Sequence, residues 1–173
     1  MKNIILVLSL ILSFNFAFAQ SPAYRISFVI PGYPDSIAFL GNYFGDKLSV
    51  ADTSTEISEE IVFSGKEPLP QGVYFFVSGA KKRLFEFLVG EDQEFKLISG
   101  PDGSPENMSV EGSEDNLIFY EYLRENKRSY QQVSDLHASL KNLEKGSDSA
   151  RLVQEKIDSI NRHSIEYKLH LMD

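Results

Sequence analysis

The sequence MSVEGSEDNLIFYEYL, residues 108–123, contains the point at which the pattern of apolar residues changes, and it divides the chain into two parts. Before Gly112, apolar residues alternate with polar ones or form short runs, which is typical of β-strands. After it they recur every three or four residues, which is typical of an amphipathic helix. Ser113 suits an N-cap, and Glu114 and Asp115 place carboxylates at the positive end of a helix dipole. These residues predict a helix that begins directly after Gly112.

The part before Gly112 predicts a small β-domain over residues 20–112. In residues 24–30 (YRISFVI) the apolar side chains alternate, so they share one face of a strand. Residues 73–77 (VYFFV) are apolar throughout and indicate a central strand, and the strands at 84–89 and 94–98 are expected to pair across the acidic turn 90–93. Eight short strands at this spacing favour an antiparallel sandwich or barrel. The expected strands are 24–30, 37–43, 47–53, 60–63, 73–77, 84–89, 94–98 and 108–111.

The part after Gly112 predicts a hairpin of two long helices over residues 113–173. One apolar stripe is expected along the first helix, starting at Leu117 and passing through Tyr120 and Leu123. Gly146 is expected to end this helix, with Ser147 or Asp148 capping the next one. The fold class is therefore α+β: an antiparallel β-sandwich-like domain followed by a long two-helix hairpin. We expect the stripe to bind a protein partner through Tyr130, Val133, Leu136, Leu140, Leu143, Val153, Ile157, Ile160, Tyr167 and Leu171.

The first nineteen residues have the pattern of a secretory signal peptide. Lys2 precedes an almost wholly apolar run at 4–14, and Ala17-Phe18-Ala19 matches a cleavage site. The apolar run is shorter than the roughly 20 residues that cross a bilayer, so an uncleaved anchor is the weaker interpretation. We expect cleavage after Ala19, no membrane span in the mature chain, and a location in the periplasm or cell envelope.

Charge and cysteine content exclude several function classes. The formal net charge is −8, and loss of Lys2 with the signal peptide makes it −9. Such a chain repels nucleic acid and anionic lipid, so neither is an expected partner. The chain has no cysteine, which excludes disulfides, thiolate zinc sites and a redox-active CxxC motif within it. Stability after export must then come from packing alone.

No group of residues predicts catalysis, a cofactor or a metal. His163, Glu166, Tyr167 and His170 share one helical face, but residues seven apart lie ~10.5 Å apart along the axis, too far for one ion. His137 is expected at a helix boundary rather than as a base. The carboxylate runs, Glu59-Glu60 and Glu91-Asp92 with Glu94, lack a scaffold that would make them an acid–base pair. Lys81-Lys82-Arg83 predicts a solvated hairpin tip, with electrostatic docking as the alternative.

The aromatic residues have two interpretations. Thirteen Phe and eight Tyr without Trp suggest an aromatic core. Five of them are expected between the sheets: Phe75, Phe76, Phe85, Phe87 and Phe95. Three lie in or beside predicted turns and are possible contacts for a ligand such as a sugar: Tyr33, Tyr43 and Phe44.

Several stretches resemble an N-terminal domain of unknown function found on exported thioredoxin-like (TlpA/ResA-type) thiol–disulfide proteins of Gram-negative envelopes. Residues 32–47 (GYPDSIAFLGNYFGDK) resemble its opening and residues 63–74 (FSGKEPLPQGVY) its middle. Residues 106–116 (ENMSVEGSEDN), with Phe119-Tyr120 and Tyr122-Leu123, are similar to its exit into the helix. In that family the redox chemistry belongs to a thioredoxin domain after the helices, whose paired cysteines have no counterpart here. The helical pattern still continues at 167–173, so the helix either frays there or continues in a longer chain.

This resemblance implies a non-catalytic accessory, oligomerisation or partner-binding domain of a thioredoxin-like thiol–disulfide protein. The expected partner is a second copy of the chain or a thioredoxin-like domain. The alternative hypothesis is a small-ligand or glycan-binding β-module of the cell envelope. A self-contained hydrolase is a third hypothesis, but no motif in the sequence favours it.

Overall fold

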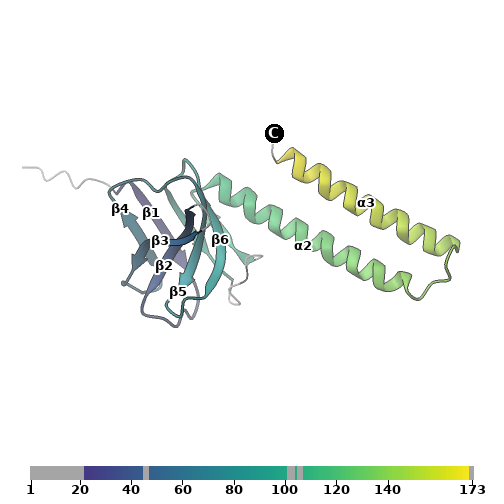
Figure 1. Cartoon of the computed structure of the whole chain (residues 1–173), viewed down its shortest axis with the longest axis horizontal. Helices are drawn as coiled ribbons and strands as arrows, with labels where there is room; N and C mark the ends of the chain where they lie inside the picture. Colours follow the sequence, from purple (N-terminus) through teal and green to yellow (C-terminus); the bar gives the residue numbers. More distant parts are fainter. Residues whose placement is uncertain (1–21, 45–46, 101–103, 105–106, 172–173) are drawn as a thin grey trace, which may run out of the picture.

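A computed structural model describes residues 22–44, 47–100, 104 and 107–171 of the protein. It consists of a β-sandwich from which a pair of antiparallel helices projects (Figure 1). This α+β arrangement confirms the predicted fold class. The predicted signal peptide at 1–19, the predicted turn at Gly45-Asp46 and the last two residues lie outside the described part of the chain.

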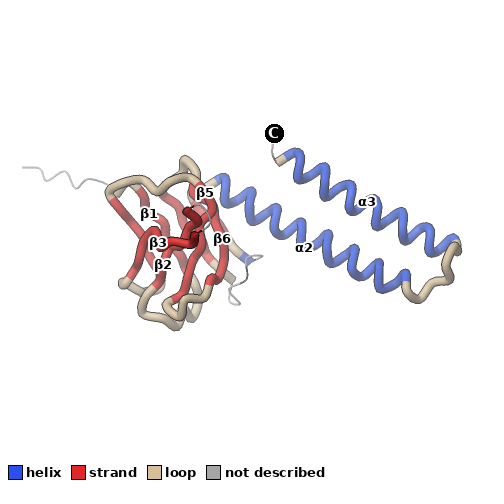
Figure 2. The backbone as a smooth tube through the Cα atoms, in the orientation of Figure 1, coloured by secondary structure: helices blue, strands red, loops and turns tan. Residues whose placement is uncertain are grey.

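The sandwich has two layers, seen as the red strands of Figure 2. One sheet has the strand order β4-β1-β7-β8 and the other has the order β3-β2-β5-β6. All eight predicted strands are present, with boundaries that differ from the prediction by at most two residues. The strands are β1 (Tyr24–Val29), β2 (Ala38–Phe44), β3 (Lys47–Ser54), β4 (Ile61–Gly65), β5 (Gly72–Ser78), β6 (Arg83–Val89), β7 (Glu94–Ile98) and β8 (Ser109–Glu111).

Two expectations about strand pairing are wrong. β1 and β7 pair in parallel, with Ile26 opposite Phe95, so the first sheet is mixed rather than purely antiparallel. β6 and β7, which we expected to pair, lie in different sheets. The chain crosses between the sheets at the turn 90–93, where the Gln93 amide bonds to the carbonyl oxygens of Gly90 at 2.9 Å and Leu69 at 3.3 Å. A strand in either sheet can point its alternate apolar side chains into the core between the sheets. The alternation in the sequence therefore does not reveal which strands pair.

The core between the sheets is built largely of aromatic rings around Phe28. The ring centroid of Phe28 lies 4.8 Å from that of Phe76, 5.3 Å from Phe87 and 5.8 Å from Phe63 and Phe85. Tilted and edge-to-face arrangements of this kind are favourable beyond the area they bury. The prediction that Phe76, Phe85, Phe87 and Phe95 belong to the core is therefore confirmed.

The first helix, α2 (Glu114–Leu140), begins where the sequence predicts and is attached to the edge strand β6. The Ser113 side chain accepts a hydrogen bond from the Asn116 backbone and caps the helix. The Leu88 N–H donates to Asn116 Oδ1 at 2.8 Å, and Asn116 Nδ2 donates to the Leu88 carbonyl at 2.7 Å. One turn later, the Tyr120 hydroxyl donates to the Glu86 carbonyl at 2.6 Å. Both side chains are fully buried, so α2 closes this sheet edge with polar contacts.

The spacing of these contacts follows from the two backbone geometries. Four residues of a helix rise by about 6 Å, and two residues of a strand rise by about 6.7 Å. Asn116 and Tyr120 therefore meet Leu88 and Glu86 in register, as a neighbouring strand would. The unpaired edge of β6 is satisfied by side chains of a helix instead of by another strand.

The second helix, α3 (Asp148–His170), begins after Ser147, one of the two predicted caps, which accepts a hydrogen bond from the Ala150 N–H. It runs back along α2 toward the sandwich (Figure 1). α2 ends at Leu140, six residues before Gly146, so the predicted end of this helix is wrong. Leu143 consequently lies in the connection between the helices and not on a helical stripe.

The apolar residues of α2 form two surfaces rather than the single predicted stripe. Tyr120 and Leu123 pack on the sandwich core. Val133 and Leu136 are half-buried farther along, where α3 is the neighbouring element. At 100° per residue, Tyr120 and Val133 point roughly 140° apart. Leu117, which we placed on the stripe, is 49% exposed.

Replacing Asn116 by Ala should lower the free energy of unfolding by roughly 2–4 kcal/mol, because it leaves both backbone groups of Leu88 without a partner. Urea denaturation measures this change. The matched control is Asn126→Ala on the exposed part of α2, expected within about 0.5 kcal/mol of the wild type. Equal small effects of the two substitutions would contradict the role given to Asn116.

Alkaline pH should destabilise the fold through Tyr120. Burial, and secondarily the charge of Glu86, raises the pKa of Tyr120 above its usual value near 10. The unfolded chain loses this proton above about pH 10 while the folded chain keeps it, so this contribution is full below pH 10 and is lost as the pH rises. In urea titrations between pH 8 and 11, Tyr120→Phe should show a shallower alkaline decline than the wild type. Tyr130→Phe, at a 76% exposed position, is the matched control and should leave the free energy of unfolding at pH 8 within about 0.5 kcal/mol of the wild type.

Candidate interaction surface

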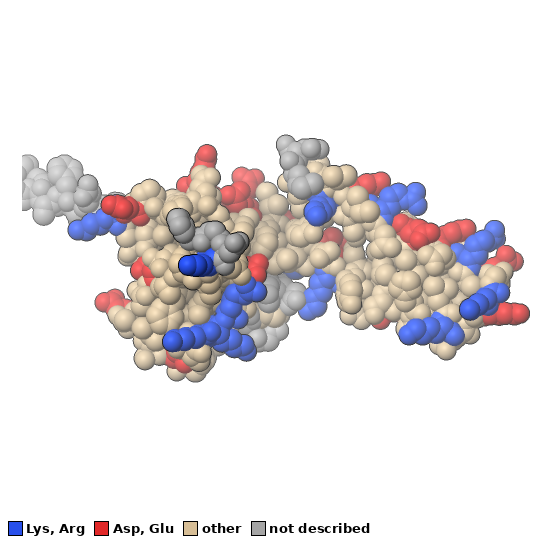
Figure 3. Space-filling view, in the orientation of Figure 1, with Lys and Arg blue, Asp and Glu red and all other residues tan. Residues whose placement is uncertain are grey.

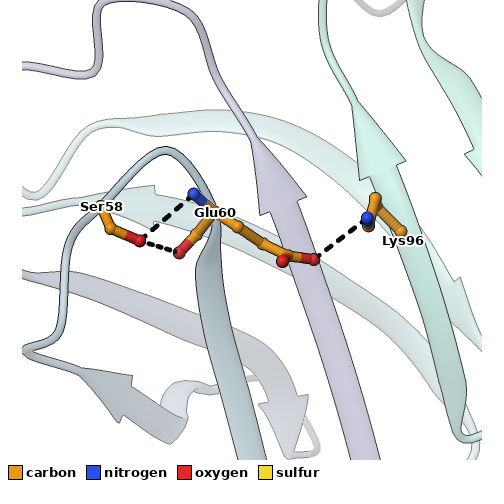
Figure 4. Close-up of polar contacts among 3 residues, drawn as sticks. All are labelled: Ser58, Glu60 and Lys96. Atoms are coloured by element: carbon orange, nitrogen blue, oxygen red, sulfur yellow. Dashed lines mark hydrogen bonds and ion pairs between the residues drawn. The ribbon is translucent and has the colours of Figure 1, made fainter.

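The outer faces of the two sheets differ in chemistry. On the outer side of the β4-β1-β7-β8 sheet, polar side chains line a shallow depression that includes Arg25, Ser27, Glu60 and Lys96. Lys96 Nζ lies 3.3 Å from Glu60 Oε1, and the Ser58 hydroxyl bonds the backbone of Glu60 (Figure 4). The hydrogen bond from Ser27 and the ammonium of Lys96 lower the pKa of Glu60. This face is charged and internally paired, as expected for a surface that remains in water.

The outer side of the β3-β2-β5-β6 sheet is apolar. Tyr43 from β2, Leu48 and Val50 from β3, and Val73 from β5 are 55%, 58%, 62% and 44% exposed. Tyr43 lies opposite Leu48, and Val50 lies opposite Gly41, so the four side chains are neighbours on three adjacent strands. We call these four residues the outer apolar face. A contiguous exposed apolar patch of this kind marks a binding surface more often than an isolated apolar residue does.

Phe75 lies beneath this face, and the prediction that it belongs to the inter-sheet core is wrong. It is 1% exposed, yet it is absent from the core cluster that contains Tyr74 and Phe76 on either side of it. The Tyr43 ring meets it edge-on at 5.1 Å, and the guanidinium of Arg83 lies 4.6 Å from its ring centroid. Because side chains alternate along a strand, neighbours in the run VYFFV had to face opposite sides.

Basic residues gather at the turn between β5 and β6, at the end of this sheet opposite to Tyr43, Leu48 and Val73. Lys81 and Lys82 are exposed there, and Lys81 has a positive φ of 62°. Arg83 forms an ion pair with Glu86 at 3.4 Å, and Asp35 accepts a hydrogen bond from the Ala80 N–H at 3.2 Å. Lys and Arg side chains gather along the lower part of the sandwich in Figure 3. This corner is thus locally basic in a protein with a formal net charge of −8.

The three predicted ligand contacts do not come together. The Tyr33 hydroxyl donates to the Ile37 carbonyl at 2.8 Å and accepts from the Gly79 N–H at 3.3 Å. Both hydrogen bonds are made within the protein, so this hydroxyl holds the loop before β2 against the β5–β6 turn. Its ring packs edge-on against Phe76 at 5.6 Å, and burial raises its pKa. Tyr43 belongs to the outer apolar face. Phe44 ends β2, and its side chain lies outside the described structure.

The predicted partner-binding stripe lies mostly along the contact between the two helices. Ile157 is 2% exposed, whereas Tyr130 is 76% exposed. The other helical members are half-buried: Val133, Leu136, Leu140, Val153, Ile160, Tyr167 and Leu171. Much of the apolar surface of the predicted stripe is therefore buried between α2 and α3. Other exposed apolar residues of α3 lie outside the predicted stripe: Leu152, Ile165 and Leu169.

Two depressions flank the helices. One of about 580 Å³ is lined by charged groups of α2 together with His163 and Tyr167 of α3. Burial and the carboxylates of Glu121 and Glu125 raise the pKa of Tyr167. The other, of about 340 Å³, is a mainly apolar cleft between Leu88, Phe119, Tyr122 and Leu171 at the base of the hairpin.

The polar residues considered from sequence lie mainly at exposed positions of the described chain. Glu166, His170 and His137 are exposed, and His137 lies in the last turn of α2, as expected for a helix-boundary histidine. Among the described residues no three potential ligands converge on a common metal position. Asp92 accepts a hydrogen bond from the Glu114 N–H at 3.3 Å and so supports the start of α2.

Comparison with protein-family models, with curated proteins and with solved structures finds no match to this chain. Within the described residues, neither helix is long and apolar enough to cross a membrane.

Replacing Leu48 and Val50 by Lys should change the free energy of unfolding by less than about 1 kcal/mol, because both side chains are already mostly in water. The same double variant should bind less of a hydrophobic dye such as ANS. Phe75→Ala, by contrast, should cost about 3–5 kcal/mol, because its ring is covered. Urea denaturation and dye fluorescence measure these effects, and a large loss of stability in the Lys variant would show that the face serves folding instead.

Proposed function

We propose that this chain is a non-catalytic, partner-binding accessory domain of an exported thioredoxin-like thiol–disulfide protein of the cell envelope. The observation that carries the proposal is the outer apolar face. Apolar side chains on a sheet face are normally covered by another layer of structure. Here the opposite face of the same sandwich is charged, so the apolar character is specific to one side.

The shape of the molecule supports the same proposal. The hairpin is joined to the sandwich through the first turns of α2, and it extends away from the strands (Figure 1). The projecting helices and the outer apolar face provide two separate surfaces for contact. An accessory domain that holds or spaces other domains needs such surfaces and no reaction centre.

The setting within an envelope thiol–disulfide system comes from the resemblance of residues 32–47, 63–74 and 106–116, together with the signal-peptide pattern. The thiol chemistry would belong to the partner, because this chain contains no cysteine. The role left to this chain is to bind and position that partner or a second copy of itself.

A glycan-binding module is the second candidate, and the exposure of Tyr43 favours it. Sugar-binding modules stack rings of the ligand on exposed aromatic faces. Tyr43 projects from a sheet face, but Phe75 beside it is covered and the Tyr33 hydroxyl is engaged elsewhere. Glycan-array binding that is lost in Tyr43→Ala would replace the accessory-domain proposal with this one.

The proposal is tested by site-specific photocrosslinking in intact cells. A photoreactive amino acid at position 50 lies on the outer apolar face, and one at position 25 lies on the charged face of the other sheet. We expect crosslinks from position 50 to a protein that mass spectrometry identifies as a CxxC-bearing thioredoxin-like protein or as the same chain. Position 25 should give few. Equal labelling from both positions, or none from position 50, would contradict the proposed function.

A further inference from the structure

The edge strands of the described sandwich differ in how far they are protected. β6 is closed by Asn116 and Tyr120 of α2, and β8 has only three residues. β3 has eight residues, and β2 is its only ladder partner within the described chain. From Lys47 to Ala51 every residue of β3 is exposed, on both sides of the sheet. A long exposed edge of this kind is a template for pairing with another strand.

A β-bulge determines how a further strand can align with this edge. Gly41 of β2 lies opposite Val50, and the preceding residue Leu40 lies opposite Asp52, so Ala51 is the extra residue of β3. Asp52 therefore takes the ladder position directly after Val50, and Ala51 is left out of the ladder. The free edge offers five consecutive ladder positions, at residues 47, 48, 49, 50 and 52.

From this edge we infer that β3 pairs antiparallel with β3 of a second copy of the chain, with Ser49 of each copy at the two-fold axis. The four-stranded sheets of the two copies then form one continuous sheet, and their outer apolar faces join side by side. Such a contact uses the same surface on both copies, as two-fold dimers do. This inference rests on the proposed function, for which it names the partner.

The side chains of β3 are complementary to themselves in this register. Leu48 of one copy lies opposite Val50 of the other, and the symmetry forms this apolar pair twice. Lys47 of each copy lies opposite Asp52 of the other, which pairs opposite charges. The small side chain of Ser49 lies opposite itself. Each position of the free edge thus meets a residue of matching chemistry.

Neighbouring registers lose this complementarity. Each side chain must stay on its own side of the sheet, so the alignment can change only in steps of two residues. A ladder centred on Val50 or on Leu48 keeps a single apolar pair and separates Lys47 from Asp52 of the other copy. The register centred on Ser49 is therefore the favoured one.

The contact is small, and this sets the expected strength of the dimer. Five ladder positions span about 13 Å, which buries less area than the ~1,200–2,000 Å² of stable interfaces. We therefore expect a weak dimer whose population depends on protein concentration. The two copies of Lys47 lie about 13 Å apart along the ladder, farther than the ~8 Å screening length at physiological salt. Their mutual repulsion is therefore small.

The test begins with crosslinking, which is clean because the chain has no cysteine of its own. Ser49→Cys places the two new thiols directly opposite each other, with Cα atoms about 4.5–5.5 Å apart and within the range of a disulfide. Mild oxidation of the purified variant should give a covalent dimer on non-reducing electrophoresis. The matched control is Thr53→Cys, an exposed position of the same strand. Its thiols would lie about 20 Å apart and should give at most roughly a tenth of the dimer.

Sedimentation equilibrium measures the same dimer without a crosslink. Ser49→Lys places two like charges opposite each other at the axis, and Lys47→Glu places a carboxylate opposite Asp52 of the other copy. Each should raise the Kd of the dimer about fivefold or more. Lys66→Glu makes the same charge change at an exposed position outside the strands and should alter the Kd less than about twofold. Circular dichroism confirms that every variant is folded.

Three outcomes would overturn the inference. The first is a chain that stays monomeric and gives no crosslink from Ser49→Cys. The second is equal crosslinking from Ser49→Cys and Thr53→Cys, which indicates random collision. The third is a dimer that neither Ser49→Lys nor Lys47→Glu weakens, because its interface then lies elsewhere.

The proposed function is judged separately, by the photocrosslinks from position 50 in intact cells. A monomeric chain that still crosslinks there to a thioredoxin-like protein overturns only the second copy as the partner and leaves the proposed function standing. Absence of any crosslink from position 50 contradicts the proposed function itself.

Discussion

The contact between the Asn116 side-chain amide and the backbone of Leu88 determines how the two halves of this protein are joined. An amide carries both a donor and an acceptor, so one buried side chain satisfies both free groups of an edge-strand residue. With the Tyr120 hydroxyl one turn later, it fixes the direction of α2 relative to the strands. The rest of the hairpin follows, because α3 packs on α2. The same contact closes one edge of the sheet whose outer side carries the apolar residues.

The two outer faces of this sandwich differ in how their side chains meet water. The core depends on aromatic packing around Phe28 and needs no disulfide. Glu60 and Lys96 illustrate the solvated face, where charges pair with each other. Leu48 and Val50 illustrate the other face, where apolar groups remain exposed to water, which costs solubility. A surface with that cost is best understood through what it binds, and we propose a protein partner.

Several features of the fold were predictable because they depend on local chemistry. Alternation located the strands, the Ser113 and Ser147 caps located the helix starts, and the change of period at Gly112 divided the two halves. The pairing of β1 with β7, the covered position of Phe75 and the two surfaces of α2 were not predictable in this way. Each depends on which element lies opposite, and an apolar residue has the same appearance in the sequence whichever layer covers it. Of the candidate binding residues, only Tyr43 lies on the outer apolar face. Leu48, Val50 and Val73 were read simply as parts of strands.

The sequence by itself determined the elements and the amount of apolar surface each must hide, because backbone propensities, caps and periodicity act over a few residues. The tertiary structure alone decided which of those surfaces are hidden. It covers Phe75 with Tyr43 and Arg83, uses the helical stripe largely within the hairpin, and leaves Leu48 and Val50 in water. The physical reason is that burial is a property of two surfaces meeting, and residues distant in the chain meet only once the sheets and helices have taken their places.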